Sequence, residues 1–163
     1  MERKRAIEMH LPDGKLPGYY AQIVKGIAER TELFDRIKEL LVLNSPEDAA
    51  PVLELLRHYK TEAEELELVL LPEEGVEREA LYEDYVIESV GGRVYTVWSD
   101  TAYFRITAEE PEAEPAPALL QLQENMIASV REDGFVWHAV DRKEEEWVER
   151  VARAYRCGVV WLR

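Results

Sequence analysis

The chain has very little of several residue types and features that would define a class of protein. It contains a single cysteine, Cys157, so it forms no internal disulfide, and a reducing cytoplasm is the predicted compartment. No apolar run approaches the roughly 18 residues that a membrane helix needs. The segment before Leu11 is too short and too charged for a signal peptide. These absences predict a protein without a membrane partner.

Amide side chains are also scarce. The 163 residues include only five of them, which are Asn44, Asn125, Gln22, Gln121 and Gln123. Few amides together with many glutamates are typical of hyperthermophile proteins, so the composition predicts a thermophilic, archaeal source.

Common catalytic and cofactor-binding motifs are missing as well. The chain has no P-loop, no dinucleotide-binding glycine fingerprint, no HExxH, no CxxC and no nucleophile elbow. His10, His58 and His138 are far apart in the sequence and show no metal-ligand spacing, which predicts a buried or boundary histidine at each position. We therefore expect no cofactor and no metal.

The negative charge is concentrated in the middle of the chain. Residues 61–114 hold three Lys/Arg and sixteen Asp/Glu, net −13, whereas residues 1–60 are neutral and residues 115–163 carry −1. A field of this sign repels nucleic acid and attracts basic partners. It is equally typical of a solvated sheet edge that resists aggregation.

The same segment holds most of the strand signal. Gly91-Gly92 between two β-rich runs, 81–90 and 93–99, predicts a hairpin with a tight turn, and residues 102–107 predict a third strand. Strand alternation then separates an uncharged face from a second face. The second face is expected to present four side chains together: Arg93, Tyr95, Tyr103 and Arg105.

The apolar periodicity predicts an α+β fold, in which an N-terminal helical layer packs on an antiparallel β-meander and a C-terminal βαβ unit docks on it. The expected arrangement is one domain with two lobes. Residues 1–108 form the helices and the antiparallel sheet, and residues 118–163 form an α-β-α-β lobe. An acidic Pro/Ala/Glu loop, residues 109–117, joins them.

Individual elements follow from the same patterns. Apolar stripes predict helices beginning near Pro17, across 33–41, across 51–59 and across 119–130. The last two strands, 135–140 and 159–162, flank a helix with tight connections, which predicts that they run parallel.

Three functions remain open at this level. The missing motifs and the acidic segment favour a non-enzymatic interaction or assembly module that uses Arg93, Tyr95, Tyr103 and Arg105 to bind a protein, either a basic partner or a second copy. An enzyme with a pocket between the helical layer and the βαβ unit would use His58, His138 and Asp141. A single-stranded RNA binder would use the same tyrosines and arginines, although the net charge of −14 disfavours it.

Overall fold

The computed structural model describes residues 1–14 and 17–163, and its helices and antiparallel sheets make an α+β fold, as predicted. The chain divides into two compact units. One consists of Glu2–Leu70 with Glu88–Arg93, and the other of Met1, Leu71–Ile87 and Val94–Arg163. Each unit is described by itself.

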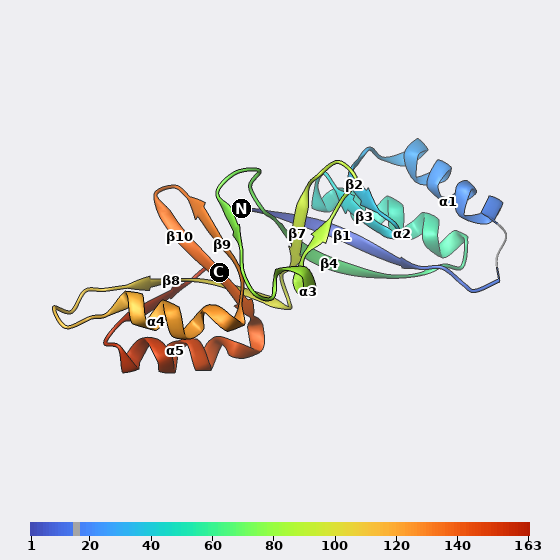
Figure 1. The fold of residues 1–163 in the computed structure, drawn as a ribbon. Coiled ribbons are helices and arrows are strands. Elements are labelled where there is room, and N and C mark those ends of the chain that lie inside the picture. The colour runs from blue at the N-terminus through green and yellow to red at the C-terminus, as the bar shows by residue number, and fades with distance from the viewer. Residues whose placement is uncertain (15–16) are drawn as a thin grey trace. The chain divides into compact units, whose positions relative to one another are not determined.

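The first unit contains six main elements in the order β-α-β-β-α-β (Figure 1). They are β1 (Glu2–His10), α1 (Pro17–Arg30), β2 (Leu33–Ile37), β3 (Leu40–Leu43), α2 (Ala49–His58) and β4 (Glu62–Leu70), with a 3-10 turn, Pro46–Asp48, before α2. Its strands are antiparallel and lie in the order β2-β3-β1-β4. We call Glu2–Leu70 the first repeat.

The second unit contains the same order of elements. They are β8 (Thr101–Thr107), α4 (Pro115–Leu122), β9 (Met126–Glu132), β10 (Phe135–Asp141), α5 (Glu145–Ala154) and β11 (Gly158–Trp161), with 3-10 turns at Gln123–Asn125 and Arg142–Glu144. Its antiparallel strands lie in the order β11-β8-β10-β9, with β5 (Val76–Arg78) added beside β9. We call residues 101–161 the second repeat. Between the repeats, the chain also forms α3 (Tyr82–Tyr85), β6 (Ile87–Glu88) and β7 (Val94–Val97).

The two repeats share one topology. Numbered within each repeat, the strand order is 2-3-1-4 or its reverse, which is the βαββαβ arrangement of ferredoxin-like folds. The positive-φ residues other than glycine fall at matching places in the described chain. Lys38 and Asp133 lie in the turn between the second and third strands, and Lys60 and Arg156 follow the second helix.

The second helix of each repeat ends in the same way. After α2, Thr61 donates its backbone N–H to the carbonyl of Leu56 at 2.9 Å, and after α5, Cys157 donates to Ala152 at 2.9 Å. Each bond spans a left-handed residue, as in a Schellman cap. The left-handed residue of the α5 cap is therefore Arg156 and not a glycine.

Helices cover one face of each sheet. Ile7 and Met9 of β1 pack into the core formed with α1 and α2. Ala102 and Phe104 of β8 pack into the core formed with α4 and α5. Because side chains alternate along a strand, Glu8 and Arg105 lie on the opposite faces, which the two helices of each repeat do not cover. We call these faces the helix-free faces.

Several predicted elements are correct. Helices begin at Pro17 and cover the predicted 51–59 stripe. Strands β10 and β11 flank α5, and each pairs antiparallel with β8, so they are parallel to each other as predicted. Strand β8 lies between them, because β11 joins the far edge of β8.

Other predicted elements are wrong. The 33–41 stripe forms the hairpin β2–β3, since apolar residues at these spacings also suit two short strands. Residues from Met126 onward form β9 where a helix was predicted. The third predicted strand, β8, does not continue the hairpin, because it pairs with β10 and β11. The glycine turn has three residues, with Ser89 donating to the Arg93 carbonyl at 2.9 Å, which shifts the predicted register by one.

The acidic Pro/Ala/Glu segment is only partly a loop. Helix α4 begins within it at Pro115, where proline suits the first helical turn. The two units divide near Leu70, whereas the sequence predicted the boundary between lobes at residues 109–117.

Candidate functional site

The predicted Tyr/Arg face does not form an exposed surface. Tyr95 and Tyr103 are both 0% exposed. The Tyr103 hydroxyl lies 2.6 Å from Thr96 Oγ1, and burial raises the pKa of Tyr103 to about 12. These two tyrosines therefore do not form the predicted binding face, because Thr101–Phe104 of β8 are all buried and Tyr95 of β7 is buried as well.

Arg93 has partners inside the first unit. Its guanidinium lies 4.4 Å from the Phe34 ring centroid and donates to the Phe34 carbonyl at 3.2 Å. Asp35 Oδ2 is 3.9 Å away. These contacts hold Arg93 against the β2 strand, and Arg93 belongs to a different unit from Tyr95, Tyr103 and Arg105.

Arg105 is partly exposed and lies beside exposed apolar side chains of the second repeat. Its guanidinium lies 4.3 Å from the Phe135 ring centroid and 5.8 Å from that of Trp137, and its register partner across β11 is Val160. Phe135 is 47% exposed and Val160 is 36% exposed. Among the described residues, the buried Nε of Arg105 has no hydrogen-bond partner. We call these four residues, Arg105, Phe135, Trp137 and Val160, the Arg105 surface.

His138 is held inside the second unit. Its Nδ1 lies 2.8 Å from Ser129 Oγ, and Ser129 donates to Glu79 at 3.1 Å. Burial lowers the pKa of His138 to about 4, so the imidazole is neutral near pH 7. His58 lies at the exposed end of α2 in the first unit, where its ring meets Tyr59 edge-on. The prediction of a buried or boundary residue is therefore wrong for His58.

Asp141 has a structural role at the end of β10. Its carboxylate accepts hydrogen bonds from the Tyr85 hydroxyl at 2.5 Å and from the Lys143 backbone N–H at 2.8 Å. The hydrogen bond from Tyr85 contributes most to lowering the pKa of Asp141, and the bond from Lys143 contributes next. The hydrogen bond between Tyr85 and Asp141 is also the main reason that the pKa of Tyr85 is raised to about 12. Asp141 is thus ionised and caps the turn before α5.

A cavity of about 630 Å³ surrounds this pair in the second unit. Its polar lining includes Asp84, Asp100, Asp141, Arg142 and Lys143, and neither His58 nor His138 contributes to it. The Arg142 guanidinium donates to backbone carbonyls of Trp98 and Thr101, both at 2.7 Å. Its charge is therefore used to hold the loop, and the three predicted catalytic residues do not meet in this cavity.

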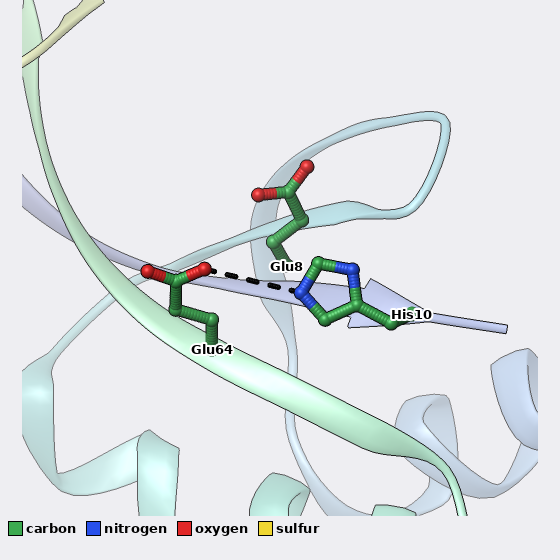
Figure 2. Close-up of side chains that lie close together, drawn as sticks. All are labelled: Glu8, His10 and Glu64. Atoms are coloured by element: carbon green, nitrogen blue, oxygen red, sulfur yellow. Dashed lines mark ion pairs between the residues drawn. The ribbon is translucent and has the colours of Figure 1, made fainter.

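A second group of polar side chains lies on the helix-free face of the first repeat. Glu8, His10 and Glu64 each offer a ligand atom, and these atoms all lie within 4.8 Å of one another. Figure 2 shows the three side chains grouped above the β1 and β4 strands, with His10 Nε2 3.9 Å from Glu64 Oε2. His10 is half exposed, whereas a buried or boundary position was predicted. We call these residues the Glu8 cluster.

The Arg105 surface and the Glu8 cluster occupy equivalent places in the two repeats. Glu64 and Val160 are each the third residue of the last strand. Their register partners on the first strand are Glu8 and Arg105. The same position of the same sheet face thus carries carboxylates in one repeat and a guanidinium with aromatic rings in the other.

Sequence reasoning missed most of both groups. A local signal existed, because Glu8-x-His10, Glu62-x-Glu64 and Phe135-x-Trp137 each place two related side chains on one strand face. The register that brings Glu8 to Glu64 was not available from the sequence.

Comparison with protein-family models finds no match, and comparison with curated protein sequences finds none either. Within the described residues, no helix combines the length and the apolar character needed to cross a membrane.

Proposed function

We propose that the chain is a non-enzymatic assembly module, in which the Arg105 surface of one copy binds the carboxylates of the Glu8 cluster on a second copy. The observation that carries this proposal is the Arg105 Nε–H, which is buried without an acceptor among the described residues. A buried donor left without a partner costs about 1–3 kcal/mol. Arg105 as a whole is partly exposed, so an incoming carboxylate would bind the accessible part of its guanidinium and offset this cost.

The residue types around Arg105 suit a protein contact. Arginine and tryptophan are enriched among the residues that dominate binding energy, and Arg105 lies close to Trp137 and Phe135. The rings hold the guanidinium in place before a partner arrives, which lowers the entropy cost of binding. Val160 adds apolar area at the edge of the surface.

Charge complementarity favours a second copy as the occupant. A chain with net charge −14 repels its own copies in general, so self-association needs a contact that places a cation on carboxylates. The Glu8 cluster supplies two carboxylates on a sheet face that matches the one carrying Arg105. A contact between two different patches is heterologous, so it produces a ring or an open filament.

The test is sedimentation velocity over a concentration series with charge-reversed variants. Arg105→Glu and the double variant Glu8→Lys/Glu64→Lys should each be monomeric, because like charges then meet. Mixing the two variants should restore assembly, since each contact in the mixture again joins opposite charges. Circular dichroism is used to check that each variant keeps the wild-type fold.

Two matched controls accompany this test. Arg153→Glu makes the same charge change on an exposed residue of α5, and Glu29→Lys/Glu54→Lys does so on exposed residues of α1 and α2. Both should assemble like the wild type. A wild-type chain that stays monomeric at its highest soluble concentration would overturn the proposal, as would variants that do not recover on mixing. Binding of a basic protein to the Glu8 cluster by a monomeric chain would point to the other predicted occupant.

A further inference from the structure

We infer that the Glu8 cluster binds a divalent transition-metal cation of the Zn²⁺ class. The geometry comes from the pairing of β1 with β4. Glu8 and His10 are two residues apart on one strand and share a face, and Glu64 is the register partner of Glu8 on the neighbouring strand. One imidazole nitrogen and two carboxylate oxygens therefore converge (Figure 2).

The acidic side chains on the opposite face of β1 and β4 have arginine partners, unlike those of the Glu8 cluster. There, Arg3 pairs with Glu67 at 3.2 Å and Arg5 pairs with Glu65 at 3.4 Å, so each of these acids has a cation beside it. On the helix-free face, Glu8 lies directly opposite Glu64. Like charges directly opposite each other destabilise a strand pair, and a bound cation would convert this repulsion into attraction.

The donor set selects the kind of metal. Imidazole with carboxylates suits Zn²⁺ and similar first-row ions, whereas Ca²⁺ and Mg²⁺ prefer oxygen ligands alone. Around tetrahedral Zn²⁺, ligand atoms lie about 3.3 Å apart, given bond lengths of about 2.0–2.2 Å. His10 and Glu64 are 50% and 63% exposed, so their side chains can close the remaining gap by rotating in solvent. Three protein ligands leave further positions for water.

The site adjoins a hollow in the first repeat. A cavity of about 610 Å³ is lined by His10 and Glu64 together with Leu53, Leu56 and Arg57 of α2, among others. His10 and Glu64 therefore border this cavity, whereas Glu8 does not line it.

The experiment is a calorimetric titration of the wild-type chain with ZnCl₂ alone, followed by the absorption spectrum of the Co²⁺ form, which reports the number of ligands. We expect one tight site per chain. His10→Ala and Glu64→Gln should each weaken Zn²⁺ binding by more than about tenfold, the lower limit seen when only an outer-shell partner is lost. His58→Ala and Glu65→Gln are the matched controls and should bind as the wild type does.

Absence of binding would overturn the inference, and so would binding that survives in His10→Ala or falls equally in His58→Ala. The inference does not rest on the proposed assembly, although it uses the same carboxylates. Repeating the titration on Arg105→Glu, which should be monomeric, separates the two. Zinc binding by that variant supports the metal site whatever the fate of the assembly.

Discussion

Glu8 and Arg105 hold the same position in two repeats of one topology and carry opposite charges. Each lies on the helix-free face of the first strand, and each faces the third residue of the last strand, Glu64 in one case and Val160 in the other. The two repeats therefore have the same topology but carry surfaces of opposite charge. The first predictions concern the energetic cost of each surface to the isolated chain.

Replacing Arg105 should abolish assembly without lowering the stability of the monomer. Arg105→Met keeps an extended side chain between the rings and removes the buried donor, so the free energy of unfolding of the monomer should be unchanged or raised by up to about 1 kcal/mol. Urea unfolding of dilute protein measures it, and sedimentation should show assembly lost. A loss of stability above about 2 kcal/mol would mean that Arg105 serves the fold itself.

Removing one carboxylate of the Glu8 cluster should stabilise the chain without metal. Glu8→Gln relieves the repulsion across β1 and β4 and should raise the free energy of unfolding by about 0.2–1 kcal/mol in EDTA. Glu67→Gln, on the other face, removes the partner of Arg3 and should leave stability unchanged or slightly lowered. Equal effects of the two substitutions would show that Glu8 and Glu64 do not repel each other.

Zn²⁺ should compete with assembly, because Glu8 and Glu64 serve both. Adding ZnCl₂ should shift the sedimentation profile toward the monomer, and EDTA should reverse the shift. The control is MgCl₂ at the same concentration, which matches the ionic strength but suits an imidazole ligand poorly. An increase in mass with Zn²⁺ would show instead that the metal bridges two copies.

His138 should make the fold acid-sensitive. Its pKa is about 4 in the folded chain and about 6.5 when unfolded, so the unfolded state binds more protons between these values. The stability associated with the neutral ring is complete above pH 6.5 and is lost as the pH falls toward 4, by about 3 kcal/mol in total. Urea unfolding at pH 7 and pH 4.5 should show a smaller pH dependence in His138→Gln than in the wild type. His58→Gln should retain the wild-type dependence.

Gly158 should be intolerant of a side chain at the start of β11. A Cβ built at this position would lie 2.4 Å from Thr107 Oγ1, its register partner on β8. Gly158→Ala should destabilise the chain by about 1–3 kcal/mol through overpacking. The double variant Gly158→Ala/Thr107→Ala removes the clashing oxygen and should recover most of the loss. Failure to recover would place the strain in the backbone.

Local patterns predicted local structure well. The apolar stripe that includes Val52, Leu55 and Leu56 predicted α2, and the apolar stripe after Pro17 predicted α1. These segments depend on residues three or four apart, which a sequence displays directly. The α+β class follows from such segments taken together.

Long-range pairing was not predictable in the same way. Tyr103 alternates with Phe104 as on a half-exposed strand, but both are buried, since both faces of β8 are covered. Glu8 and Glu64 are brought together only by the register of two strands separated by two helices and a hairpin. The repeat itself left one readable trace, the pair Tyr59-Lys60-Thr61 and Tyr155-Arg156-Cys157 at the ends of α2 and α5.

The position of β8 between β10 and β11 has a consequence for how the second repeat folds. The last two strands do not pair with each other, because each pairs with the strand that begins the repeat. The pairing of β11 with β8 therefore joins the two ends of the repeat. Contacts between residues this far apart in the sequence form more slowly than local contacts. A fragment that begins after the acidic Pro/Ala/Glu segment would contain both strands and lack the one that joins them. We expect this fragment to remain unfolded, although the composition of residues 109–117 resembles that of a linker between domains.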